Sequence, residues 1–224
     1  MRAWDFHFLA QALFLGATLF FILRPFEPLG YPVAYIALSG ASLVILQNIE
    51  LNVLAGVYAA VAAVVFGILE RTRYEKALHA GAHQWFVFGY AAVYALVAGA
   101  IFFAYPGTFR MEAQALVVLF SGALAYECIA RERGIGNVYA GERGLLLATS
   151  GVYALVLSQL SWALALLPIG YINSAGILGA VFFFSMDLFF ASLAKTLNSR
   201  MLVVSMGLFV SIAAIILGLS RWTI

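Results

Sequence analysis

Long apolar runs divide this chain, and they constrain its fold more than any other feature. They recur along all 224 residues and are continuous, not alternating. A helix needs about 20 apolar residues to cross a bilayer, and a membrane β-barrel needs alternation instead. Eight membrane-spanning helices are therefore predicted. They are Phe6–Leu23, Gly30–Leu46, Leu51–Leu69, Gln84–Tyr105, Ala113–Ala130, Gly144–Leu167, Tyr171–Leu193 and Met201–Leu219.

Composition supports the same class of protein. The chain is 65% hydrophobic and 10% charged, whereas an ordinary soluble domain is about 25% charged. Little sequence remains between the apolar runs, so a separate soluble domain is not expected. We predict an all-α, polytopic integral membrane bundle that forms one domain over residues 1–224. The formal net charge of +2 gives no reason to expect nucleic-acid binding.

Basic residues predict the orientation of these spans. With eight spans, nine of the twelve Lys and Arg residues fall on one face. Short cytoplasmic loops carry the excess of basic residues, so that face is predicted to be cytoplasmic and both termini non-cytoplasmic. The expected location is a cell membrane, the plasma membrane of a prokaryote. The nine residues are Arg24, Arg71, Arg73, Lys76, Arg131, Arg133, Arg143, Lys195 and Arg200.

The same basic residues form a predicted collar at the inner surface of the membrane. Anionic lipid headgroups are attracted to basic residues at this level. The predicted headgroup contacts are Arg71, Arg73, Lys76, Arg131, Arg133, Arg143 and Arg200. Within the topology, the second and third spans are joined by a very short link, Gln47 to Glu50. A re-entrant pair there remains an alternative, and it would not change the later orientation.

Small residues recur at a spacing of four in the later spans. Because lipid tails are as apolar as leucine, membrane helices associate through close packing of such residues. The pattern predicts tightly packed later helices. The residues are Ala91, Ala95 and Gly99, then Ser150, Ala154 and Ser158, then Gly176 and Ala180, then Gly207, Ser211, Ala214 and Gly218.

Asp187 is the strongest candidate for a functional residue. It lies about two turns inside the cytoplasmic end of the seventh span, among phenylalanines. An acid at such depth usually faces protein or water. Its helical spacing from Gly176, Ala180 and Ala191 places it on the packed face, and a hydroxyl of Ser150 or Ser205 could satisfy it. Two interpretations remain open, a hydrogen-bonded structural acid and an ion- or ligand-binding group.

Three other polar residues complete the set of candidates. Glu127 precedes Arg131 by four residues, which favours an ion pair at the membrane interface. Asn173 and Gln159 lie in the outer halves of their spans, and Gln159 is expected to bond a neighbouring helix. With Ser150 and Ser205, these residues are the only predicted ion- or ligand-binding positions besides Asp187.

No pattern for a metal, a cofactor or catalysis stands out. Glu75, His79 and His83 recur every four residues, but Gly81 interrupts them and no third strong ligand is apparent, so no metal site is predicted. The glycines after Arg133 lack the Lys-Ser/Thr ending of a phosphate-binding loop. The single cysteine, Cys128, excludes an internal disulfide. The sequence therefore does not favour an enzyme and predicts no cofactor.

Two classes of function remain. The first is a membrane subunit or scaffold that acts through helix packing and contacts with partners or lipids. Such a protein is expected to associate with itself or with other membrane subunits. The second is a small proton- or ion-linked transporter that uses the intramembrane acid Asp187. Transport would require a polar path near the midplane, and we favour the first class because few residues could line one.

Overall fold

The computed structural model describes residues 32–48, 52–76, 83–104, 111–132, 140–167 and 169–219. Within these ranges the structure is all-α, and the first predicted span, residues 6–23, lies outside them. The described helices are α2 (Pro32–Asn48), α3 (Asn52–Lys76), α4 (His83–Ala104), α5 (Met111–Glu132), α6 (Ala140–Ala165), α7 (Tyr171–Leu193) and α8 (Ser199–Leu219).

Five of these helices, α4 to α8, are long and apolar enough to cross a membrane. Two shorter apolar segments, Val33–Ile45 and Val57–Leu69, belong to α2 and α3. The chain is therefore a multi-pass helical membrane protein by the length and composition of its helices. The seventh predicted span agrees residue for residue with α7, while α3 and α6 extend beyond their apolar runs at the charged ends.

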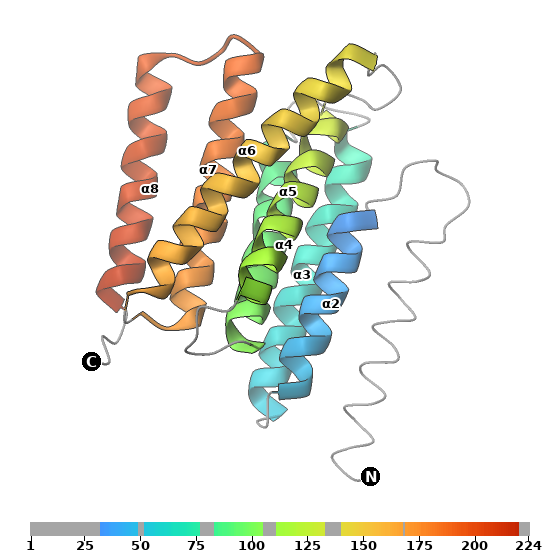
Figure 1. The fold of residues 1–224 in the computed structure, drawn as a ribbon, viewed down its shortest axis with the longest axis vertical. Coiled ribbons are helices and arrows are strands. Elements are labelled where there is room, and N and C mark those ends of the chain that lie inside the picture. The colour runs from blue at the N-terminus through green and yellow to red at the C-terminus, as the bar shows by residue number, and fades with distance from the viewer. Residues whose placement is uncertain are drawn as a thin grey trace.

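Helix α4 lies at the centre of the bundle. It contacts α2, α3, α5 and α7, and it has the largest buried share of the membrane-length helices. Successive helices run in opposite directions, and α6 crosses the bundle obliquely (Figure 1). Helix α8 stands at one edge, where its substantial packing within the described part of the chain is against α7.

Small residues allow α4 and α7 to approach closely. A Cβ atom added at Gly179 of α7 would lie 2.6 Å from the Cβ of Ala95 and 3.3 Å from the carbonyl oxygen of Ala91. Further along the same seam, a Cβ atom at Gly99 would lie 3.5 Å from the Cβ of Ala175. Only glycine fits at position 179 without a shift of the backbone, so the stripe predicted in α4 forms the tightest described helix contact.

The α5–α6 seam confirms the stripe predicted in α6. Ser150 and Ala154 are buried, and Ser158 is half-buried. A Cβ atom added at Gly122 of α5 would lie 3.3 Å from the Cβ of Ala154. Helix α6 therefore packs on α5 through its small residues, and its opposite face is exposed.

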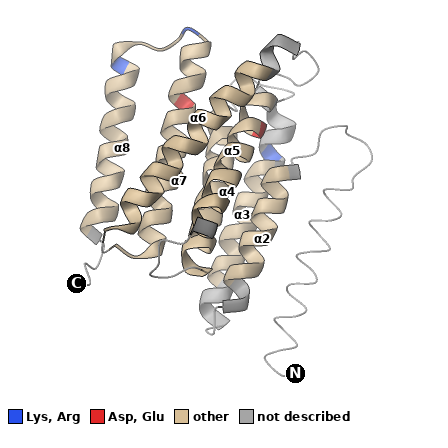
Figure 2. Cartoon of the chain, in the orientation of Figure 1, with Lys and Arg blue, Asp and Glu red and all other residues tan. Residues whose placement is uncertain are grey.

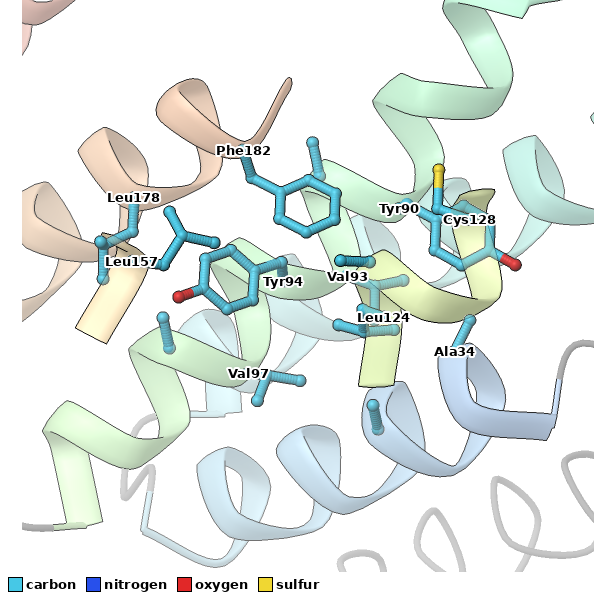
Figure 3. Close-up of a cluster of buried hydrophobic side chains, with 14 of the residues drawn as sticks. Ala34, Tyr90, Val93, Tyr94, Val97, Leu124, Cys128, Leu157, Leu178 and Phe182 are labelled. Carbon is cyan, nitrogen blue, oxygen red and sulfur yellow. The ribbon is translucent and has the colours of Figure 1, made fainter. Parts of the chain in front are cut away.

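The core between these seams is apolar and aromatic. In the close-up, Tyr94 of α4 lies among Leu157 of α6 and Leu178 and Phe182 of α7 (Figure 3). The Tyr94 and Phe182 rings lie 5.2 Å apart between centroids. Because these side chains come from three helices, the core is continuous across the later part of the bundle.

The stripe predicted in α8 packs against none of the helices that the structure describes. Nothing lies within 4 Å of a Cβ atom added at Gly207 or at Gly218, and Ser211 and Ala214 are exposed. None of the apolar window of α8 is buried. Among the described residues, the prediction of tight packing is therefore wrong for α8, because α7 contacts the helix face that carries Ser205, Phe209 and Ile216.

Candidate functional site

Glu127 of α5 caps another helix. Its side chain is only 6% exposed, and its Oε2 atom accepts a hydrogen bond of 2.9 Å from the backbone N–H of Ala34. Ala34 lies in the first turn of α2, where N–H groups have no partner within their own helix. A carboxylate is favourable there because the amino end of a helix carries partial positive charge. The acid thus fastens α2 to α5.

This cap is a role that sequence reasoning missed. The predicted ion pair between Glu127 and Arg131 stays a prediction, since the Arg131 side chain lies outside those described. A weak signal for the cap was present in the sequence. Pro32 begins α2 without an N–H donor, as is common at a first helical position, but nothing in the sequence pairs α2 with α5.

Asp187 is buried in α7, as its helical spacing predicts, with 7% of its surface exposed. The buried face of α7 includes more residues than the stripe predicted around Asp187. Asn173, Gly176 and Ala180 are half-buried, whereas Phe182 and Phe190 are fully buried. The reason is that α7 packs against α4, α6 and α8, so some of the phenylalanines near Asp187 are buried together with it.

The two hydroxyls predicted to satisfy Asp187 differ in position. Ser150 is buried in α6, and its hydroxyl donates to the Leu147 carbonyl of its own helix at 3.0 Å. A serine hydroxyl has one proton, so that proton is already used. Ser205 is half-buried in α8, which packs on α7. A contact from Ser205 to Asp187 stays a prediction.

Gln159 does not bond a neighbouring helix in the described part of the chain, so that contact stays a prediction. It lies on the exposed face of α6. The interhelical amide is instead Gln114 of α5. Its Oε1 atom accepts hydrogen bonds from Ser158 at 3.1 Å and from Ser161 at 3.0 Å. A signal existed, because Ser158 and Ser161 lie on the packed face of α6 together with Ala154.

Tyrosine hydroxyls form further polar contacts that sequence reasoning did not single out. Tyr153 of α6 donates to the Ser185 carbonyl of α7 at 2.8 Å. The hydroxyls of Ser42 in α2 and Tyr58 in α3 are 3.3 Å apart. The Tyr94 hydroxyl is buried without a hydrogen bond among the described residues, and Ser121 of α5 is a hydroxyl neighbour. These groups are spread over different helix pairs.

The described basic residues and the two described acids all lie in the same half of the bundle, with Lys195 and Arg200 at its very end (Figure 2). Arg71, Lys195 and Arg200 are exposed. Lys195 has a φ of 56°, in the turn between α7 and α8. Arg73, Lys76, Arg131 and Arg143 lie in helices, but their side chains are outside those described, as is Arg133 altogether. Lipid contacts of this collar stay a prediction.

Metal ligands do not cluster in the described residues. No group of three or more His, Cys, Asp or Glu side chains that could hold an ion occurs among them. His79 and the side chains of Glu75 and His83 lie outside the described set. Cys128 is buried in the core as a thiol and not as half of a disulfide.

Comparison with known proteins gives no relative from which a function could be carried over. No protein family matches the chain, and neither the curated proteins nor the solved structures include a significant match.

Proposed function

We propose that this chain is a structural subunit or scaffold of a cell membrane, without catalytic chemistry of its own. The observation that supports this most directly is that several of its polar side chains form hydrogen bonds between helices. Glu127 joins α5 to α2, Gln114 joins α5 to α6, and Tyr153 joins α6 to α7. Each of these contacts fastens a pair of helices. The candidate residues Asp187, Glu127 and Gln159 occupy separate helices and do not form one polar path.

We further propose eight spans with both termini on the non-cytoplasmic side, in a prokaryotic plasma membrane. The described basic residues all lie in one half of the bundle, which supports this orientation. The cap of Glu127 supports it too, because it puts the amino end of α2 beside the carboxyl end of α5. Eight alternating spans require those two ends to share a side.

Accessibility labelling of single cysteines tests the topology. Glu75→Cys, Asn198→Cys and Thr108→Cys are placed in a Cys128→Ser background and labelled with an impermeant reagent. Positions 75 and 198 are expected to label from one side and position 108 from the other. Labelling of 75 and 108 from the same side would disprove the eight-span arrangement.

Anionic lipids are the proposed partners of the basic collar. Each basic residue near the membrane surface contributes about 1 kcal/mol of attraction to anionic headgroups. Native mass spectrometry of the protein released from mixed-lipid membranes is expected to show preferential retention of anionic lipid. A variant with Arg71 and Arg200 changed to Gln should lose part of that preference, and equal retention of zwitterionic lipid would contradict the collar.

The second candidate is a small proton- or ion-linked transporter. The specific observation in its favour is the burial of Asp187 in an apolar membrane helix, since acids at such positions often belong to ion pathways. Reconstituted vesicles with an imposed pH gradient and potential separate the two functions. The subunit proposal predicts proton flux equal to that of empty vesicles. Flux that Asp187→Asn abolishes would establish the transporter and overturn the subunit proposal.

A further inference from the structure

Gln159 places a polar amide on the outward face of a membrane helix. It lies six residues before Ala165, where α6 ends, which is about 9 Å along the helix axis. Its amide takes no part in the neighbouring cluster, in which Ser158 and Ser161 donate to Gln114. Within the described part of the chain, the Gln159 amide forms no hydrogen bond.

Other polar side chains near the membrane-facing surface are satisfied by their own helices. The Ser211 hydroxyl of α8 donates to the Gly207 carbonyl at 2.8 Å, and the Thr149 hydroxyl of α6 donates to the Leu145 carbonyl at 2.8 Å. An amide that faces hydrocarbon pays a desolvation cost unless another group bonds it. In membranes, Gln side chains commonly meet that need by bonding across to another helix.

Among the described residues of α6, those around Gln159 form a continuous face without charge. The opposite side of α6 is buried against α5, with Ala154, Leu157 and Ser161 at the contact. The residues in the middle of the outward face of α6 are exposed along the helix, and all of them except Gln159 have apolar side chains. These exposed residues are Ala148, Val152, Leu155, Gln159, Ala163 and Leu166.

We propose that the outward face of α6 is a self-association surface, on which a second copy of this chain docks through a pair of Gln159 side chains. A carboxamide carries both donors and an acceptor, so it complements itself. Two copies inserted in the same direction are related by a two-fold axis along the membrane normal. Each Gln159 then donates an N–H group to the Oε1 atom of the other, in an isologous contact.

Charge and hydrogen bonding favour α6 over α8 as the surface for a second copy. Arg200 precedes Gly207 by seven residues, about two helical turns, and so lies above the exposed small residues of α8 on the same face. A symmetric contact through that face would bring two guanidinium groups together. The α6 face has no such charge among its described residues, and its amide requires a hydrogen-bonding partner.

This inference rests on the proposed function, because it names the partner of a membrane subunit as a second copy. The proposed function and the proposed α6 contact can be disproved independently. Asp187-dependent flux would overturn the subunit function and leave the α6 contact standing. A strictly monomeric protein that carries no flux would overturn the α6 contact and leave a subunit that uses other partners.

Disulfide trapping in native membranes tests the contact directly. Leu155→Cys and Ala163→Cys, each in the Cys128→Ser background, are treated with a mild oxidant. Both are expected to yield linked dimers, because the symmetric contact brings each cysteine close to the same residue of the second copy. A disulfide forms only where the two Cβ atoms approach within about 4.5 Å. The matched control is Val204→Cys, which is equally exposed on α8 and is expected to stay monomeric. Dimers from Val204→Cys alone, or links only to a different protein, would overturn the proposal.

A second measurement asks whether Gln159 drives the association. Energy transfer between labelled copies in vesicles, measured against protein density, gives the dissociation constant. Gln159→Leu is expected to weaken association by about ten-fold, and Gln159→Asn to restore part of the loss. Ser211→Ala on α8 is the control and should not change it. Because Gln159 is exposed, its substitution does not disturb the core, and association unchanged in Gln159→Leu would refute the proposed pair.

Discussion

The α4–α7 seam and helix α8 carry the same sequence signature but have different surroundings. Both have small residues at a spacing of about four. At the seam, Gly179 faces the Ala95 Cβ and the Ala91 carbonyl, so two helix backbones nearly touch. On α8, Gly207 and Gly218 face open space. The comparison shows that small residues make close approach possible, whereas the arrangement of neighbouring helices determines whether the chain uses it.

The largest expected difference in stability between the two regions comes from replacing Gly179 in the seam and Gly207 on α8 with the same residue, valine. Gly179→Val should destabilise the protein by about 3 kcal/mol, since its side chain would overlap Ala95 and the α4 backbone. Gly207→Val should change stability by less than about 0.5 kcal/mol. Thermal unfolding in detergent measures both. Equal losses would show that α8 is packed in the protein as purified.

The next effect concerns the cap that joins α5 to α2. Glu127→Ala should cost about 2 kcal/mol, because it removes the acceptor for the Ala34 N–H group and leaves that donor buried. Glu127→Gln keeps an acceptor and should cost about half as much. The control is Thr149→Ala on α6, where the hydroxyl bonds only its own helix. The same thermal measurement applies, and a neutral Glu127→Ala would contradict the cap.

A smaller effect is expected at the polar cluster between α5 and α6. Gln114→Leu should lose about 1 kcal/mol, since it removes the acceptor for Ser158, whereas the single proton of Ser161 can still bond the Ser158 carbonyl at 2.8 Å. Ser211→Ala on α8 should be close to neutral, because its hydroxyl bonds the Gly207 carbonyl of the same helix. Chemical denaturation in mixed micelles compares the two, and a larger loss at Ser211 would reverse the contrast.

The smallest effect is predicted for Asp187→Asn. Asparagine keeps the size and much of the hydrogen bonding of a protonated acid but cannot ionise. If Asp187 is a structural, neutral group, the stability curves of the wild type and the variant should run parallel between about pH 5 and 9. Curves that diverge with pH would show that the group ionises within the folded bundle, and they would favour the transporter.

Several features could be predicted from the sequence because they depend on local physics. A span of apolar residues long enough for a bilayer predicts a helix wherever it occurs, which is why α7 agrees with its predicted range. The burial of Asp187 followed from helical spacing and from the cost of placing an acid against lipid. The close packing of Ala91, Ala95 and Gly99 followed from their size.

The remaining features depend on which helices meet, and periodicity within one helix does not contain that information. Glu127 was expected to bond Arg131 because both lie on one helix, yet the described contact is with α2, 93 residues earlier in sequence. Gln159 and Gln114 are chemically identical. The side of α6 that packs on α5 carries Ser158 and Ser161, which bond Gln114, whereas Gln159 lies on the exposed side of α6.

The sequence by itself determined that the described part of this protein consists of apolar helices, where most of them begin and end, and which residues of α4 and α6 could allow close approach. Only the tertiary structure decided which of those residues meet. A helix presents several faces with similar composition, because lipid and protein interior are almost equally apolar. The choice among them is made by contacts between distant segments, such as Gly179 with Ala95 and Glu127 with Ala34.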